Sequence, residues 1–463
     1  MQRLVAAVLA CALAGALGQS AVAKDPAAPR QQSGKPSAAQ PDEAGIGDFV
    51  IGDPVRYKNL IVFPVASKAP RNEDRYLTLD EGLKAGTVQV FEVGAQPGAA
   101  GQPAAGPVAD RPVGSRDQGP STRTRAGAAV ADPFAPPAVP ERPAPGVNPP
   151  AAPPQQGQPS PVARTADSDP FGGGQQGNAD VNHLMVLNRS DRPLYLMPGE
   201  IIYGGQQDRT IGVEAIIPPG KKPVSIEVFC VESGRWAARE ETETSDALDR
   251  LAGSSGQPMD AKARQKLVEE AKQGKFVAHA GNLDKGGRAA VQEGKGQAEV
   301  WKKVGEANAS SGAQSTSSAF TANYTNPQVL KQLEGYVEAL QRPVANHRQV
   351  VGAIVAINGK AEAVDVFQST PLFQKVWPKL LKSHALDAFD VAREPDAEKP
   401  CTLSDAREFL RTAMQAAVEK KSKSQGGLVV TKRDSEKVMS FSAGFGGMGG
   451  GFGDSVHSSG YKK

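Results

Sequence analysis

Cysteine and histidine are scarce in this sequence. Three cysteines and five histidines occur among 463 residues, and none follows a Cys-x-x-Cys or His-x-His spacing. This scarcity argues against a zinc site, and we expect no bound metal. Cys11 lies in an apolar run at the start of the chain, so Cys230 and Cys401 are the cysteines available to a folded domain. They either form a disulfide or remain buried thiols, and the sequence leaves both alternatives open.

An excess of charge of one sign is also missing. Lysine and arginine number 53, aspartate and glutamate 50, and the net charge is +3. Binding to nucleic acid or to an acidic membrane surface needs a concentrated basic patch, so neither partner is expected. No phosphate-binding loop, nucleophile elbow or other cofactor motif occurs, and we expect no cofactor.

Long apolar runs are absent beyond the first residues, which argues against a transmembrane segment in the rest of the chain. The start of the sequence combines Arg3, the apolar stretch Leu4–Leu17 and the small-residue sequence Ala21-Val22-Ala23. This order is typical of a Sec-type signal peptide over residues 1–23. We therefore expect cleavage near Ala23 and a periplasmic or secreted mature protein.

Segments rich in proline, glycine and alanine separate the remaining chain into regions. Residues 24–56 read as a flexible leader, residues 95–180 as a long disordered Pro/Ala/Gly-rich insertion, and residues 446–463 as a Gly-rich tail. Short strand patterns lie on both sides of the insertion. We therefore predict one α+β domain over residues 57–445, with mainly antiparallel sheet and several packed helices.

Several elements are clear enough to place. Asn358-Gly359 separates the strand-like runs 350–357 and 361–367 and predicts a hairpin. Helical patterns cover residues 260–273, 297–307, 326–341, 370–388 and 402–420. We expect Pro343 to end the helix before it and Pro378 to kink or split the helix around it.

Two segments concentrate polar residues beside predicted strands. The first runs from Gly199 to Arg209 and contains a Gly-Gly pair, which lets backbone approach a ligand closely. The second runs from Cys230 to Trp236. In it, Glu232 could transfer a proton, Arg235 could bind an anion with two hydrogen bonds, and Trp236 could stack on a ring. The candidate ligand-binding residues in them are Glu200, Gly204, Gly205, Gln207, Arg209, Arg235 and Trp236, and the candidate catalytic residue is Glu232.

The same segments carry a family resemblance. Gly-Gly-Gln-Gln-Asp-Arg at 204–209, Cys-Val-Glu-Ser-Gly-Arg-Trp at 230–236, Trp301, Val-Asp-Val-Phe at 364–367 and Phe-Gln-Lys-Val-Trp-Pro at 373–378 follow one another in that order. The chain thus resembles the ARG and rhodanese-phosphatase-superfamily-associated protein domain, an uncharacterised bacterial family. The resemblance adds Asp365 to the candidate ligand-binding residues, and Cys230 and Gly234 to the pattern, while Asp208 replaces a more usual asparagine. The family name records an association with ADP-ribosylglycohydrolases, which implies ADP-ribose or nucleotide-derived ligands.

Three functions remain open on this evidence. The first is an exported binding or interaction module for a small anionic ligand or an unknown partner. The second is a hydrolase acting on a phosphorylated or ADP-ribose-like substrate, with Glu232 as acid/base and Arg235 as the anion clamp. The third is a structural envelope protein in which these side chains tie the sheet to its helices. Polar side chains around an open pocket would favour the first two, and paired, sealed side chains the third.

Overall fold

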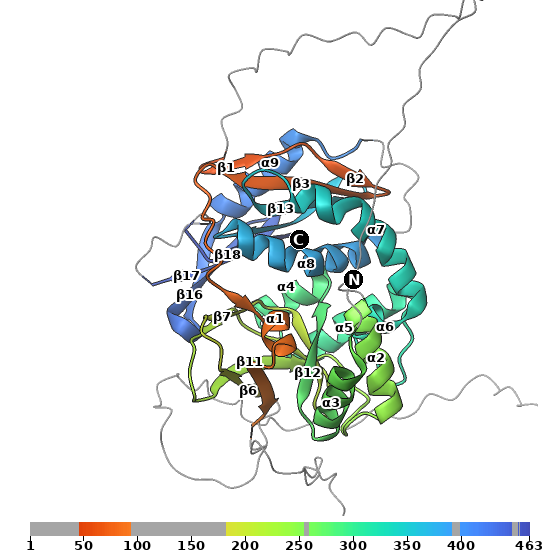
Figure 1. Cartoon of the computed structure of the whole chain (residues 1–463). Helices are drawn as coiled ribbons and strands as arrows, with labels where there is room; N and C mark the ends of the chain where they lie inside the picture. The colour runs from red at the N-terminus through yellow and green to blue at the C-terminus, as the bar shows by residue number, and fades with distance from the viewer. Residues whose placement is uncertain (1–45, 94–181, 254–258, 391–398, 447–451, 453) are drawn as a thin grey trace, which may run out of the picture. The chain divides into compact units, whose positions relative to one another are not determined.

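Antiparallel sheets with helices packed against them make up the fold, which confirms the predicted α+β class. The computed structural model describes residues 46–93, 182–253, 259–390, 399–446, 452 and 454–463 (Figure 1). The predicted signal peptide lies outside the described residues, as does the whole of the predicted insertion.

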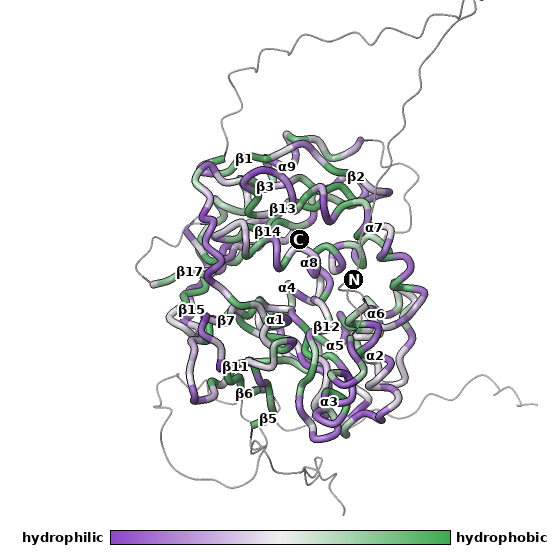
Figure 2. Tube along the Cα trace, viewed as in Figure 1, coloured by the Kyte–Doolittle hydropathy of each residue, from purple (hydrophilic) through white to green (hydrophobic). Residues whose placement is uncertain are grey.

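A nine-stranded antiparallel sheet forms one part of the fold. Its order is β1-β3-β13-β14-β18-β17-β16-β15, with β2 also paired to β3. The strands are β1 (Phe49–Ile51), β2 (Val55–Tyr57), β3 (Leu60–Ser67), β13 (Val350–Ile357), β14 (Lys360–Phe367), β15 (Ala417–Lys423), β16 (Leu428–Asp434), β17 (Val438–Phe445) and β18 (His457–Lys462). Figure 2 shows β3 and β13 as strongly hydrophobic, and both are buried along nearly their whole length.

Two predicted boundaries are wrong. Strand β1 and nearly all of β2 belong to the residues expected to be a leader, because Phe49 and Ile51 are buried on one face of the sheet. Strand β18 belongs to the residues expected to be a Gly-rich tail, yet it pairs with β14 on one side and β17 on the other. Its small residues, Ser458 to Gly460, fit in the interior of the sheet and show no apolar alternation that could predict a strand.

The hairpin predicted at Asn358-Gly359 is confirmed. Strands β13 and β14 pair antiparallel on either side of it. Asn358 and Gly359 have φ angles of 46° and 76°, the left-handed conformation that a tight hairpin turn needs and that Asn-Gly tolerates best.

A closed sheet of six strands forms the second part, in the order β11-β6-β5-β12-β8-β9. Its strands are β5 (Val88–Glu92), β6 (His183–Asn188), β8 (Glu200–Gly204), β9 (Arg209–Ile211), β11 (Val224–Cys230) and β12 (Phe276–Asn282). A three-stranded sheet of β10 (Ala215–Ile217), β7 (Leu194–Leu196) and β4 (Leu77–Thr78) adjoins it through a shared apolar core. Strands β5 and β6 pair directly, so the segment between them starts and ends in one sheet, as expected of an insertion.

Helices pack against these sheets. They are α1 (Leu79–Lys84), α2 (Glu241–Gly253), α3 (Ala261–Lys272), α4 (Lys285–Glu293), α5 (Gln297–Ser311), α6 (Ala322–Thr325), α7 (Pro327–Ala345), α8 (Thr370–Asp390) and α9 (Leu403–Gln415). Helices α7 and α8 lie on one face of the nine-stranded sheet and α9 on the other. The expected stop at Pro343 is wrong, because α7 continues through it to Ala345. Helix α8 likewise runs as one element through Pro378. The largest apolar core joins α7 and α8 to β13 and to the outer face of the closed sheet.

Of the two alternatives for the cysteines, a disulfide or buried thiols, the structure shows buried thiols. Cys230 and Cys401 are both buried and both free. Among the helices in the described ranges, none combines the length and apolar character needed to cross a membrane.

Candidate functional site

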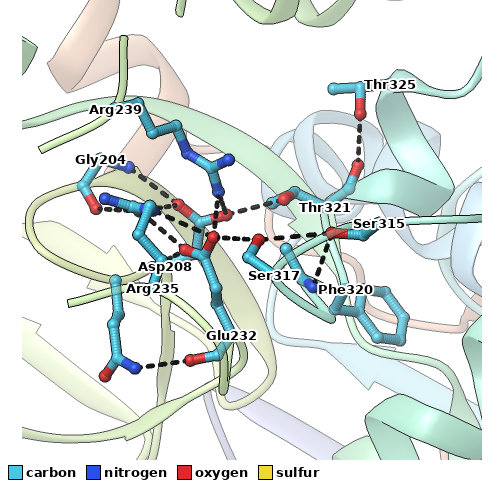
Figure 3. A network of polar contacts seen from close by, with 12 residues as sticks. Gly204, Asp208, Glu232, Arg235, Arg239, Ser315, Ser317, Phe320, Thr321 and Thr325 are labelled. Carbon is cyan, nitrogen blue, oxygen red and sulfur yellow. Dashed lines mark hydrogen bonds and ion pairs between the residues drawn. The ribbon is translucent and has the colours of Figure 1, made fainter. Parts of the chain in front are cut away.

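Two acids and two arginines meet at one end of the closed sheet (Figure 3). Asp208 lies in the turn between β8 and β9, and Glu232 follows β11 by two residues. Arg235 and Arg239 come from the segment between β11 and α2. The carboxylates of Asp208 and Glu232 are fully buried, and the side chains of Arg235 and Arg239 are 11% and 7% exposed. We call these four residues the ion cluster.

Glu232 is the centre of the ion cluster. Arg235 grips it with two hydrogen bonds, Nε to Oε1 at 3.0 Å and Nη2 to Oε2 at 2.7 Å. Its Oε1 also accepts from Arg239 Nη2 at 2.9 Å and from the Ser317 hydroxyl at 2.5 Å, and its Oε2 accepts from the Asp208 amide at 3.0 Å. Both oxygens are therefore fully engaged by donors from this chain.

Asp208 is held in a similar way. Its Oδ2 accepts from Arg239 Nη2 at 2.8 Å and from the Thr321 hydroxyl at 2.7 Å, and its Oδ1 accepts from the Gly204 amide at 3.1 Å. The Arg239 guanidinium also stacks over the Tyr203 ring at 4.8 Å. Ser317 and Thr321 connect the cluster to the segment between α5 and α7, so it joins strand ends to the helical layer.

The electrostatics of the ion cluster are balanced. Burial raises the pKa of Glu232, but the hydrogen bond from Arg235 and the two guanidinium charges outweigh burial and leave that pKa lowered. Burial raises the pKa of Asp208, and the Arg239 charge offsets it in part. Two cations thus face two anions, with the side chains paired and sealed. This geometry favours the structural alternative for Glu232 and Arg235 over a role in catalysis or anion binding.

The Gly-Gly pair supports the same turn. Gly204 has a φ of 128°, and a Cβ there would lie 2.5 Å from the Lys275 carbonyl oxygen. The carbonyl of Gly205 accepts a hydrogen bond from Arg235 Nη1 at 2.8 Å. Close backbone packing therefore accounts for glycine at 204. Trp236, by contrast, is 51% exposed.

Arg209 lies near the ion cluster but forms no ion pair with its two carboxylates. The residue is 2% exposed, and its Nη1 donates to the Gln207 side-chain oxygen at 2.9 Å. Its Nε has no hydrogen-bond partner, and within the described part of the chain no carboxylate forms an ion pair with it. A guanidinium stays charged at any relevant pH, so Arg209 is a buried charge with only a neutral partner.

Strand pairing shows where Arg209 points. It pairs with Cys230 on β11 and with Ile202 on β8. Ile202 and Ile211 belong to the apolar core of the closed sheet. Because residues two apart on a strand share a face, Arg209 is on the inner face of that sheet. Burial raises the pKa of the neighbouring Cys230 thiol, which therefore stays neutral and offers no balancing charge.

Glu200 lies apart from these residues. Its Oε1 is 3.3 Å from His279 Nε2 and 3.6 Å from Lys379 Nζ, and its Oε2 accepts from the Met197 amide at 2.9 Å. Lys379 also pairs with Asp80 on α1. The structure therefore places Glu200 in a separate ion network between β8, β12, α1 and α8.

Asp365 belongs to a third network, deep between the sheets. Arg288 on α4 grips it with Nη1 at 3.1 Å and Nη2 at 2.5 Å, and His457 Nε2 is 3.0 Å from its Oδ1. His457 Nδ1 lies 3.1 Å from Glu214, which also accepts from the Tyr195 hydroxyl at 2.6 Å. Burial opposes ionisation of Asp365, but Arg288, His457 and His384, whose Nε2 is 3.5 Å from Oδ2, hold its pKa well below the usual range.

Sequence reasoning missed most partners in these networks. His457 was missed because its segment was predicted to be a Gly-rich tail, and Arg288 because it follows Gly286 and Gly287 in a stretch without a helical pattern. Arg239 lies four residues after Arg235 in the segment between β11 and α2, and only this closeness in the sequence could have indicated it. In the described residues, no group of three or more His, Cys, Asp or Glu side chains is placed to hold a metal ion.

Comparison with known proteins gives one match. The family described as ARG and Rhodanese-Phosphatase-superfamily-associated Protein domain matches residues 48–99 and 175–447, which is more than half of the chain. The unmatched residues between these ranges fall within the predicted insertion. No curated protein and no solved structure matches.

Proposed function

The chain belongs to the ARG and Rhodanese-Phosphatase-superfamily-associated Protein domain family, and we propose that it is an exported module that binds a small anionic ligand through Arg209. The observation that carries the proposal is the burial of this guanidinium without a carboxylate partner. Glu232 and Arg235 act in this proposal as supports for the turn that presents Arg209.

The energetic argument rests on the cost of burying a charge. A buried arginine cannot neutralise itself by losing a proton, and an unpaired buried ion is costly. The pairs Arg235–Glu232 and Arg288–Asp365 show how this protein balances two other arginines, each with two hydrogen bonds to one carboxylate. An anion bound at Arg209 would supply the balance that the described residues do not.

The hydrolase alternative has less support. A general acid or base needs a free oxygen that can reach a substrate proton. Both oxygens of Glu232 already accept hydrogen bonds from the chain, and its lowered pKa keeps it ionised.

A matched pair of variants tests the binding proposal. Arg209→Met removes an unpaired charge, so stability should stay within about 1 kcal/mol of wild type or rise. Thermal unfolding with inorganic phosphate, pyrophosphate or ADP-ribose should show a ligand-dependent rise in Tm for wild type that this variant loses. Arg235→Met, a buried arginine with a carboxylate partner, should instead lose stability without any ligand. A large loss of stability in Arg209→Met, with no ligand effect on wild type, would refute the proposal.

Export has its own support and its own test. Arg3, the apolar run after it and the Ala21-Val22-Ala23 sequence motivate the proposal. N-terminal sequencing of the protein from its native host should give Lys24 as the first residue. Full-length chain found only in the cytoplasm would contradict it.

A further inference from the structure

The orientation of the Arg209 guanidinium is fixed by its neighbour. Gln207 donates from Nε2 to the Glu232 carbonyl at 2.8 Å, which turns its side-chain oxygen toward Arg209. Arg209 Nη1 donates to that oxygen at 2.9 Å. The ion cluster thus anchors Gln207 through Glu232, and Gln207 in turn sets the plane of the guanidinium.

One edge of the guanidinium is left without acceptors. Nη1 is used by Gln207, Nε has no partner, and no acceptor for Nη2 exists among the described residues. Nε and Nη2 are the two nitrogens of one guanidinium edge, whose N–H bonds point in parallel. This is the edge that matches two oxygens of a carboxylate or a phosphate.

We infer that the Nε–Nη2 edge of Arg209 receives an oxyanion group, a carboxylate or a phosphate, through two parallel hydrogen bonds. The inference rests on the proposed anion binding and adds the chemical class of the ligand. It also assigns Gln207 as the positioning residue, because this side chain keeps the edge free and correctly turned.

Two other arginines of this chain hold a carboxylate with two of their nitrogens, and one of them uses the same edge. Arg235 uses its Nε and Nη2 edge to hold the two oxygens of Glu232. Arg288 holds the two oxygens of Asp365 with its two terminal nitrogens. Arg209 lacks the corresponding carboxylate, so a ligand that supplies one pair of oxygens completes the geometry.

The surroundings favour an oxyanion over a simple halide. Arg209 lies on the inner face of the closed sheet beside Ile202 and the neutral Cys230 thiol. Charge-assisted hydrogen bonds are strengthened in such a poorly hydrated site. A spherical ion such as chloride has no pair of separated acceptor atoms to match the two parallel N–H groups, so it should be held less well.

Three variants and three anions test the inference by isothermal titration. Wild type should bind inorganic phosphate and acetate, and bind chloride at least about tenfold more weakly, because losing one charge-assisted hydrogen bond has at least that effect. Arg209→Lys keeps the charge but not the edge, and should bind phosphate about tenfold or more weakly. Gln207→Leu keeps Arg209 and should reduce the preference for phosphate over chloride. Arg209→Met should not bind.

The outcomes separate the two proposals. If Arg209→Lys binds phosphate as wild type does while Arg209→Met does not, the anion site stands and the two-bond geometry is overturned. Equal binding of chloride and phosphate by wild type overturns it as well, even if the lysine variant does not fold. If wild type binds none of these anions, the proposed function fails and this inference fails with it.

Discussion

His457 should make the stability of this protein depend on alkaline pH. Its ring nitrogens lie 3.1 Å from Glu214 Oε1 and 3.0 Å from Asp365 Oδ1, so each faces a carboxylate oxygen. Both nitrogens can donate only if the ring is protonated. Burial lowers the pKa of His457, but Glu214 and Asp365 outweigh burial and raise it to about 9, against 6.5 for an ordinary histidine.

The direction and the size of the pH effect on stability follow from the raised pKa of His457. Because the folded pKa exceeds the unfolded one, the stabilisation is complete below the unfolded value of 6.5 and is lost as pH rises through about 9. At about 1.4 kcal/mol per pH unit, the contribution is about 3 kcal/mol. Lys382 acts oppositely: burial lowers its pKa from 10.5 to about 8, so its contribution to stability improves as pH rises from about 8 to 10.5, which overlaps the His457 window.

The assay compares two proteins so that the contribution of Lys382 to the pH dependence cancels. The free energy of unfolding in urea is measured for wild type and His457→Gln from about pH 6 to about pH 10. Lys382 is present in both proteins, so the difference between the two curves isolates the histidine. That difference should shrink by about 3 kcal/mol across the range. A difference that stays constant with pH would refute the protonated bridge between Glu214 and Asp365.

Three further changes follow from the structure. Arg235→Met should cost about 3–5 kcal/mol of stability because it leaves two buried carboxylates with one arginine, as urea unfolding would show; a loss below about 1 kcal/mol would contradict the sealed cluster. Replacing residues 103–174 with a short Gly/Ser linker should leave the far-UV spectrum and Tm unchanged, since β5 and β6 pair directly; a fall of many degrees would mean that the segment packs on the domain. Removing residues 457–463 should prevent cooperative unfolding in calorimetry, because β14 and β17 both lose their partner, and a truncated chain with a normal transition would refute this.

The parts of the fold that could be predicted are those set by short sequence patterns. The Asn358-Gly359 turn and the helix spacing of residues 326–341 act over a few residues, so the sequence contains them directly. Strand β18 could not be found in this way, because His-Ser-Ser-Gly-Tyr has no alternating apolar pattern and becomes a strand through its two neighbours. Pro343 misled because the helix rule is local, whereas Val344, the next residue, is buried in the core and belongs to the last turn of α7.

The candidate site was predictable in its residues and less so in their pairing. The segments around Gln207 and Glu232 were identified because they combine unusual polar side chains. Which arginine pairs with which acid depends on contacts between residues far apart in the chain, such as Ser317 with Glu232. The sequence named both Arg209 and Arg235 as candidate ligand-binding residues. In the structure Arg235 holds Glu232 with two hydrogen bonds, whereas Arg209 forms no ion pair with a carboxylate of the described residues.

The position of β18 in the sheet has a consequence for the timing of folding. This strand fills the gap between β14 and β17 in space, but it follows every other strand in the chain. A ribosome delivers residues in sequence order, so the large sheet stays divided into two halves until its last-made strand emerges. His457 arrives at the same moment and completes the buried bridge between Glu214 and Asp365. Native structure can then form only after β18, the last of the described strands in sequence order, has been synthesised.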